Sequence, residues 1–495
     1  MKKTFIRILA LLLVLVMMMT VFVSCSKDEA PEDTQNNSVS TDLTTADILG
    51  FDKQDNGGKK FKVFLNNSYP VNERDFYVAS STENNLSKAI YERNVACEEY
   101  LGITLEFDRQ PGANGSGVPQ MLDTQIKGNS CDYDMVLITL GEGIGGNYIN
   151  IYKNVMKMDY IDLEHDWWVQ DMVDQASINE QLYFLTGDAC LSTYSYIGCV
   201  LANLAVADEW QLDVDLYQTV KDGDWTLDEM FRLYKLVGSD DNNSGVMDAG
   251  TETYGLCWHN IYSRLMWSSC NMELVVRQPD GTFKLRDTLD VRMTDFASKM
   301  KTEFDDIHSN YLYEDNDMIS DFVNDRVFLV TTCLGRAEDM KVNNMESPFA
   351  VLPMPKYDDA QEDYISVNIA AYNTIYFPAS VQSPELCAQV AEFMGYYGKE
   401  NVVPEYYDVT LKYKSNDVSA NIEMLDLIRD KLRVVPNESF GSVKVDGLGS
   451  VLSWIQMTSW TTSGDRFYTT PASYWERNAG TIAEKLNAYV LQYFQ

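Results

Sequence analysis

Apolar runs and stretches of helical periodicity alternate along the chain after residue 58. The runs at 60–65, 103–107 and 134–140 have the length and composition typical of strands. Between the first two runs, four apolar residues recur at the spacing of one helical face: Leu86, Ile90, Cys97 and Leu101. This order of strand, helix and strand predicts a parallel sheet covered by helices, and therefore an α/β fold.

Later helices are indicated by their first residues and by apolar stripes. Thr226 followed by Glu229 forms a capping box, and Ser383 followed by Pro384 is a second helix start. A last helix carries an apolar stripe of five residues: Ile482, Leu486, Tyr489, Val490 and Tyr493. With 495 residues, of which 45% are hydrophobic, the chain is long enough for two or more lobes with their own cores.

The first residues have the layout of an export signal. A basic start precedes an apolar run over 8–23, and the chain turns polar after Cys25. The run is short for a membrane span, so we predict a signal peptide over 1–24; the alternative is an uncleaved anchor helix. The tetrapeptide FVSC at 22–25 resembles a bacterial lipobox, in which the cysteine is acylated and becomes the new N-terminus.

A lipid on Cys25 would hold the protein at the outer face of the cell membrane, because each buried methylene contributes about 0.8 kcal/mol. Residues 25–58 are rich in Ser, Asp, Thr and Asn and poor in apolar residues, so we expect a flexible tether. The chain is therefore expected to be a lipid-anchored protein on the extracellular side.

Acidic residues dominate the composition. Asp and Glu number 74 against 39 Lys and Arg, which gives a formal net charge of -35. Such a surface repels the phosphates of nucleic acids, so no nucleic-acid partner is expected, and it favours neutral or cationic ligands. We expect a monomer. The cysteines after Cys25 are widely spaced and are expected to be mostly unpaired.

Five segments occur in an order that is similar to one known family. They are YDMV at 133–136, WW at 167–168, LYF followed by GD within 182–188, DWTLDE at 224–229 and FAVLPMPKY at 349–357. Together with the lipobox, this order resembles the extracellular solute-binding proteins of ABC transporters, in the large cluster that includes maltose-binding protein. The resemblance runs across nearly the whole chain after the signal peptide.

The resemblance implies a two-lobed, periplasmic-binding-protein-like fold of type II, with a hinge between the lobes and the ligand in the cleft. The N-terminal lobe would comprise 59–187 and 351–396, and the C-terminal lobe 188–350 and 397–495. The chain would cross between the lobes near 187–196, 351–355 and 396–404. Such receptors deliver their solute to the permease of an ABC transporter, so permease subunits are the expected protein partners.

Aromatic side chains are candidates for contacts with a carbohydrate, because sugar C–H faces stack on aromatic rings while charged side chains bind the hydroxyls. Trp167 and Trp168 are adjacent among charged residues, and two neighbours on a regular element cannot both face one core. The other aromatic candidates are Tyr194, Tyr196, Trp258, Trp267 and Trp460. The polar candidates are Glu142, Asp188 and Arg336. Each aromatic is equally suited to core packing, but together they lead us to expect an oligosaccharide ligand.

A glycine-rich segment, GEGIGG at 141–146, follows the third predicted strand and matches the pattern GxGxxG. This pattern has three interpretations: a dinucleotide fingerprint, a flexible turn, or a loop of the cleft whose backbone amides contact the ligand. The first interpretation is the weakest, because the loop does not follow the first strand and an exported protein has little access to NAD.

An acidic segment at 240–252 resembles a calcium loop. Its candidate ligands are Asp240, Asn242, Ser244, Val246 through its carbonyl, Asp248 and Glu252. The alternative is a solvated acidic turn. If calcium binds, it would be structural, and no other cofactor is expected.

An enzyme would need a nucleophile, a metal site or paired carboxylates. The chain has 3 histidines, far apart, and it lacks HExxH, CxxC and GxSxG patterns. We therefore expect a binding protein and not an enzyme. The alternatives are a surface glycoside hydrolase, since paired carboxylates can occur among so many acidic residues, and a receptor for a non-sugar solute such as a peptide.

Overall fold

The computed structural model describes residues 43–436, 439 and 471–494, apart from gaps at 68, 82–83, 111–116, 145–148, 241–242, 244–249, 305, 313–314, 343–344 and 412–417. The chain divides into two compact units, Met1–Thr45 and Ala46–Gln495. The elements below belong to the second unit, except that α2 (Thr45–Leu49) begins one residue before it. Within the described residues, no helix combines the length and the apolarity that a membrane span requires.

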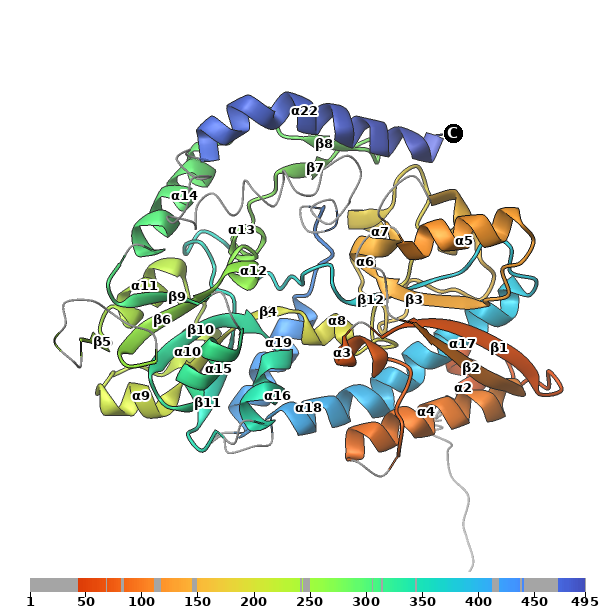
Figure 1. The fold of residues 1–495 in the computed structure, drawn as a ribbon, viewed down its shortest axis with the longest axis horizontal. Coiled ribbons are helices and arrows are strands. Elements are labelled where there is room, and N and C mark those ends of the chain that lie inside the picture. The colour runs from red at the N-terminus through yellow and green to blue at the C-terminus, as the bar shows by residue number, and fades with distance from the viewer. Residues whose placement is uncertain are drawn as a thin grey trace, which may run out of the picture. The chain divides into compact units, whose positions relative to one another are not determined.

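The first sheet has the strand order β12–β3–β1–β2 (Figure 1). Its strands are β1 (Lys59–Asn66), β2 (Ile103–Gln110), β3 (Met135–Thr139) and β12 (Asn373–Tyr376). β1 pairs in parallel with both β2 and β3, which confirms the parallel sheet predicted from the apolar runs. β12 comes from much later in the chain and pairs antiparallel with β3.

α4 (Asn85–Leu101) connects β1 to β2 and has the face that the sequence predicted. Its four predicted apolar residues are all buried: Leu86, Ile90, Cys97 and Leu101. Asn84 caps its first turn by accepting a hydrogen bond from the Ser87 amide at 2.8 Å. The helix ends at Gly102, whose φ of 60° is a conformation that favours glycine.

The second sheet has the strand order β11–β4–β10–β6–β5, with β9 paired in addition to β6. Its strands are β4 (Gly198–Asn203), β5 (Gly238–Ser239), β6 (Thr253–His259), β9 (Ser309–Leu312), β10 (Val327–Cys333) and β11 (Phe349–Pro353). β10 is parallel to β6 and antiparallel to β4, so this sheet is mixed. A two-stranded ribbon, β7 (Val275–Arg277) and β8 (Phe283–Leu285), stands apart from it.

Helices surround both sheets in Figure 1. The longer ones are α5 (Gly117–Lys127), α11 (Leu227–Tyr234), α14 (Val291–Phe304), α15 (Asp315–Val323), α16 (Gly335–Val342), α17 (Pro384–Tyr397), α18 (Val403–Leu411), α19 (Val418–Asp430) and α22 (Pro471–Leu491). The short ones include α3 (Pro70–Glu73), α6 (Leu140–Gly143), α7 (Met172–Ala176), α8 (Ser192–Ser195), α9 (Leu204–Glu209), α10 (Leu216–Lys221), α12 (Asn260–Ser263) and α13 (Met266–Ser269).

The two predicted helix starts differ in how they are capped. Thr226 accepts a hydrogen bond from the Glu229 amide at 3.3 Å, as a capping residue does. Ser383 does precede α17, but its hydroxyl makes no capping bond. It accepts a hydrogen bond from Lys59 Nζ at 2.8 Å instead, and so links α17 to the start of β1.

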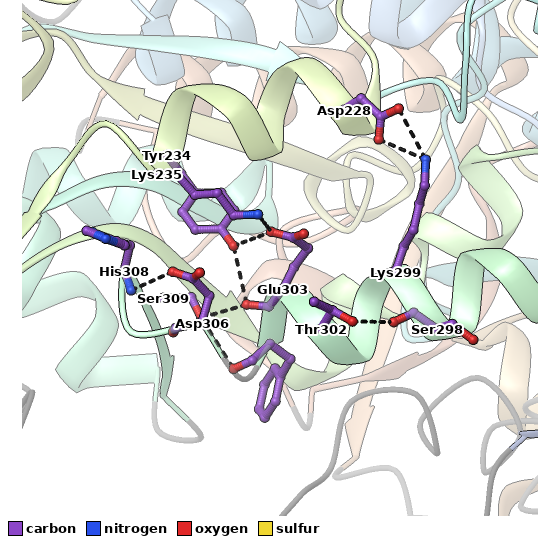
Figure 2. Close-up of polar contacts among 11 residues, drawn as sticks. Asp228, Tyr234, Lys235, Ser298, Lys299, Thr302, Glu303, Asp306, His308 and Ser309 are labelled. Atoms are coloured by element: carbon purple, nitrogen blue, oxygen red, sulfur yellow. Dashed lines mark hydrogen bonds and ion pairs between the residues drawn. The ribbon is translucent and has the colours of Figure 1, made fainter.

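Polar contacts join both ends of α11 to the second half of α14 (Figure 2). Near the start of α11, Asp228 pairs with Lys299 Nζ at 2.8 Å. At its end, Tyr234 Oη donates to Glu303 Oε2 at 2.6 Å. Burial and this bond raise the pKa of Tyr234 well above its ordinary value, so the phenol stays protonated and remains a donor. The contacts fix two helices that cover the second sheet.

The chain enters the second sheet at β4, directly after α8, and returns to the first sheet at β12. β11 pairs with β4 throughout its length, so residues 351–353 belong to the second sheet. The return therefore begins after Pro353, slightly later than the predicted boundary at 351. The other lobe boundaries stay predictions. No disulfide joins the eight cysteines of the described part of the chain.

Candidate functional site

A pocket of about 460 Å³ lies where segments following strands of both sheets meet. Its lining comes from the segment after β1 (Tyr69, Pro70, Val71 and Arg74), from the end of α8 and the residue after it (Ser195 and Tyr196), from the segment after β6 (Tyr262), and from the last residue of β10 and the segment after it (Cys333, Gly335, Arg336 and Glu338). We call it the tyrosine pocket. The carboxyl ends of strands are the usual place for ligands in α/β folds.

Three tyrosines give the pocket its aromatic surface. Tyr69 is 43% exposed, Tyr196 is half-buried and Tyr262 is buried. The Tyr196 hydroxyl donates to Asn72 Oδ1 at 3.1 Å, which fixes its ring. Burial raises the pKa of Tyr196 and of Tyr262 well above the ordinary value, so both are neutral phenols near neutral pH. Neutral rings with fixed positions are surfaces on which an apolar face can stack.

An ion pair joins the two sides of the pocket. Arg74 donates from Nη1 to Glu338 Oε1 at 2.8 Å and from Nη2 to Glu338 Oε2 at 2.9 Å. This parallel pair of bonds is the strongest geometry for arginine and a carboxylate. The bond to Glu338 raises the pKa of Arg74, although its burial alone would lower it. The side chains remain 30% and 21% exposed, so they also face the pocket.

A buried hydrogen-bond network holds the segment after β1 in place. Asp75 accepts from the Ser192 amide at 2.7 Å, from Ser192 Oγ at 2.6 Å and from Asn373 Nδ2 at 3.0 Å. Asn373 Nδ2 also donates to the Asn72 carbonyl at 2.9 Å. Burial raises the pKa of Asp75 to about 7. The network thus ties the pocket segment to α8 and to β12.

Two predicted site residues, Tyr196 and Arg336, line the tyrosine pocket. The sequence interpretation missed Tyr69, Arg74, Tyr262 and Glu338, which do too. Tyr69 and Arg74 could have been predicted, because they follow the predicted strand at 60–65 and ligands bind at the carboxyl ends of such strands. No local pattern marks Glu338.

The premise that Trp167 and Trp168 cannot both face one core is wrong. Both are buried, at 4% and 2% exposure. Each indole Nε1 donates to the fully buried carboxylate of Glu392 at 3.0 Å, and His165 Nδ1 lies 2.9 Å from the same carboxylate. Both tryptophans can be buried here because Glu392 on α17 accepts a hydrogen bond from each indole. Neither lines the tyrosine pocket.

The remaining described candidates are also buried and lie outside the lining of the tyrosine pocket. Asp188 pairs with Arg429 Nη2 at 2.8 Å and accepts a hydrogen bond from Tyr194. Trp258 on β6 and Trp267 on α13 are fully buried. Their positions favour core packing, the alternative that the sequence left open for each aromatic.

The first three residues of the glycine-rich segment, Gly141 to Gly143, belong to the short helix α6 after β3. Glu142 is buried there and accepts from Asn66 Nδ2 at 3.1 Å. Gly143 packs under Tyr376, because a Cβ at this position would lie 2.0 Å from the ring. The Gly141 amide donates to the Ala370 carbonyl at 3.0 Å. The described part of the segment, residues 141–144, is therefore engaged in packing, while residues 145–148 lie outside the described residues.

Most of the predicted calcium loop, and Trp460, lie outside the described residues. Asp240 and Glu252 are described, and Glu252 is fully buried, but 241–242 and 244–249 are not described. Among the residues that the structure describes, no group of three or more His, Cys, Asp and Glu side chains is arranged to hold a metal ion. A structural calcium ion stays a prediction.

No protein-family model matches the sequence, and neither does any curated protein. Solved structures do match. The galacto-N-biose/lacto-N-biose I-binding protein of an ABC transporter from Bifidobacterium longum is 9% identical, with a TM-score of 0.56, over 88% of this chain and 99% of that chain. The GacH receptor of Streptomyces glaucescens is 10% identical, with a TM-score of 0.51, over 86% and 99%.

An ABC substrate-binding protein from Listeria monocytogenes, in complex with cycloalternan, is 11% identical, with a TM-score of 0.50, over 87% of this chain and 99% of that chain. Nearly the full length of each protein is matched, so the similarity concerns the whole fold. It confirms the two-lobed, periplasmic-binding-protein-like α/β fold predicted from the sequence.

Proposed function

We propose that the chain is the extracellular substrate-binding lipoprotein of an ABC importer. It binds an oligosaccharide in the tyrosine pocket and delivers it to a membrane permease. The observation that carries this proposal is the pocket itself: three tyrosines, two arginines and a glutamate gather at strand ends in a fold shared with three transport receptors. The B. longum and L. monocytogenes proteins were solved with lacto-N-biose and cycloalternan.

The chemistry of the pocket suits a sugar. The rings of Tyr69, Tyr196 and Tyr262 offer surfaces for pyranose C–H faces, and the Arg74–Glu338 pair offers both donors and acceptors for hydroxyls. Its volume lies within the range of about 300–1,000 Å³ that is usual for small-molecule sites.

The described lining of the tyrosine pocket lacks the pair of free carboxylates that a glycoside hydrolase needs. Such enzymes use two carboxyl groups about 5–9.5 Å apart across the scissile bond. Among the described lining residues of the tyrosine pocket, Glu338 is the single carboxylate, and both of its oxygens already bind Arg74. The pocket therefore supports binding without turnover.

Delivery to the permease depends on the predicted anchor. A lipid at Cys25 followed by a flexible tether over 25–58 keeps the receptor beside its permease and raises their effective concentration. The same anchor accounts for an extracellular position at the cell membrane.

Binding and turnover are tested together on the purified protein. Neutral and acidic oligosaccharides are titrated by calorimetry, and the mixtures are then analysed by chromatography. We expect saturable binding with no shortened products. Tyr69→Ala should weaken the best ligand by about fivefold or more, because a stacked ring contributes about 1 kcal/mol. Tyr91→Ala is the matched control, since Tyr91 is 49% exposed and lies outside the pocket lining. Shorter products, or equal losses in both variants, would contradict the proposal.

A further inference from the structure

The Arg74–Glu338 ion pair joins the lobes that are built on the first and the second sheet. Arg74 ends α3, in the connection between β1 and α4 of the first sheet. Glu338 lies on α16, which follows β10 of the second sheet. The chain itself passes between the sheets at α8 and again after Pro353, and neither residue belongs to those segments. The pair is therefore a non-covalent link between the lobes, separate from the chain crossings.

The geometry of the pair depends on how the two lobes are placed. Two parallel bonds join the side chains, from Nη1 to Oε1 at 2.8 Å and from Nη2 to Oε2 at 2.9 Å. Such a pair fixes the orientation of the guanidinium and the carboxylate as well as their separation. A rotation of one lobe away from the other would thus break both bonds together. The side chains are 30% and 21% exposed, so solvent and salt screen the attraction only in part.

Each partner of the pair is attached to a buried part of its own lobe. Asp75, next to Arg74, is fully buried in the hydrogen-bond network that includes Asn373 of β12. Ala337, next to Glu338, is fully buried in a core cluster that contains Val330 of β10. Because both side chains project from fixed backbone, the pair opposes a movement that separates the lobes.

The two lobes also supply different walls of the tyrosine pocket. Tyr69 belongs to the connection after β1, and Tyr262 to the segment after β6. A sugar can stack on both rings only while the lobes are together. The position of the Arg74–Glu338 pair in the lining of this pocket thus links the state of the pair to the assembly of the site.

We propose that the Arg74–Glu338 pair is a latch that holds the lobes together before a ligand arrives, so that the pocket is already assembled when a sugar reaches it. The consequence for sugar binding rests on the proposed carbohydrate-binding function, whereas the latch itself does not. If the pocket is assembled in only a fraction of the molecules, the apparent affinity for a ligand is reduced by that fraction. The latch therefore raises the affinity for any sugar that contacts both walls.

The latch is tested by measuring the separation of the lobes in the absence of sugar. Spin labels are attached to Thr124→Cys on α5 and to Gln218→Cys on α10, two exposed positions that lie on different lobes. Cys25 and Cys131 are replaced by Ser in the full chain, because the other cysteines are buried and are not labelled. Pulsed electron paramagnetic resonance then gives the distribution of distances between the labels. We expect a single, narrow distribution when the latch is intact.

Three variants decide whether the pair controls that distance. Arg74→Gln and Glu338→Gln should each add a population at longer distance, because the ratio of closed to open molecules falls by about fivefold, or about 1 kcal/mol. The double variant should add no more than either single one, since one contact can be lost only once. Arg109→Gln is the matched control: Arg109 on β2 pairs with Glu73 at 2.9 Å and with similar exposure, 41% and 27%, but within the first lobe.

Unchanged distances in both single variants, or additive effects in the double variant, would overturn the latch. A long, broad distribution with the pair intact, or equal lengthening in Arg109→Gln, would do the same. Melting curves establish that each variant is folded. Arg74→Lys keeps the charge but not the two parallel bonds, so it should give an intermediate distribution, and one as long as that of Arg74→Gln would count against the pair. Because no sugar is present, loss of a direct ligand contact cannot imitate these results. A failure of the proposed function would appear separately, as the absence of sugar binding in calorimetry.

Discussion

The buried Glu392 carboxylate is the site at which a single substitution should destabilise the protein most clearly. Glu392 is fully buried on α17 and accepts hydrogen bonds at 3.0 Å from both indoles, at 3.0 Å from the Asp162 amide, and lies 2.9 Å from His165. Glu392→Gln keeps the shape of the side chain but replaces one acceptor oxygen with an N–H₂ group. That group would face the donor of Trp167 or Trp168.

The magnitude follows from the contacts. A hydrogen bond to a charged group contributes about 1.5–3 kcal/mol, and a buried donor left without an acceptor costs about 1–3 kcal/mol. The variant loses one acceptor and removes the negative charge beside His165. We therefore expect the free energy of unfolding to fall by about 3–5 kcal/mol, as in other buried pairs that lose one partner.

Urea unfolding followed by far-ultraviolet circular dichroism measures this change without relying on the two tryptophans as reporters. Glu385→Gln, an exposed change in the first turn of the same helix, is the control and should cost less than about 1 kcal/mol. Ligand affinity should be unchanged in both folded variants, because Glu392 does not line the tyrosine pocket. An unfolding free energy of Glu392→Gln within about 0.5 kcal/mol of the wild type would refute the reasoning.

The same cluster predicts a pH dependence. Burial alone lowers the pKa of His165, but its hydrogen bond to Glu392 and the charge of that carboxylate raise the pKa above the ordinary 6.5. A raised histidine pKa means that this contribution to stability is complete below pH 6.5 and is lost as the pH rises through the folded-state pKa. Stability of the wild type should decline over that window, and the decline should be smaller in Glu392→Gln.

Three further predictions concern other parts of the chain. Burial raises the pKa of Asp75 from 3.8 to about 7, so the folded protein binds this proton more tightly than the unfolded chain does, and the free energy of unfolding should fall as the pH rises between those values. Asp75→Asn should flatten this decline. An unchanged pH profile in the variant would contradict the raised pKa of Asp75. Cys25→Ala should abolish palmitate labelling and release the protein from the membrane fraction or leave its signal peptide attached; labelling that persists would remove the anchor. If the segment at 240–252 binds calcium, adding calcium should raise the melting temperature and a chelator should reverse the rise, whereas no shift with either would leave it as an acidic turn.

Much of the first sheet could be predicted from local pattern. The run at 60–65 and the stripe from Leu86 to Leu101 became β1 and α4, because buried strands and amphipathic helices impose short periodicities that a sequence displays directly. Thr226 behaved as predicted for the same reason, since a cap acts on an amide three residues away. The resemblance in motif order was sufficient to predict the two-lobed fold.

The site was harder to predict, because its residues meet only through the fold. Arg74 and Glu338 are far apart in sequence, and neither carries a local mark of its partner. The error on Trp167 and Trp168 has the same origin: the rule that neighbours cannot both be buried ignores Glu392, which α17 brings from more than two hundred residues away. Long-range partners of this kind leave no periodicity in the sequence.

The buried network around Asp75 determines how much of the tyrosine pocket is ordered before a ligand arrives. Asp75 accepts hydrogen bonds from Ser192 and Asn373, and Asn373 also donates to the Asn72 carbonyl. These bonds constrain the segment from Tyr69 to Arg74 even in the absence of any sugar. A ligand therefore loses little affinity to ordering this wall, whose conformational entropy has already been removed by folding. Selectivity among ligands then rests on fixed geometry, and changes at Asn373 or Ser192 would weaken binding of every ligand without altering which one is preferred.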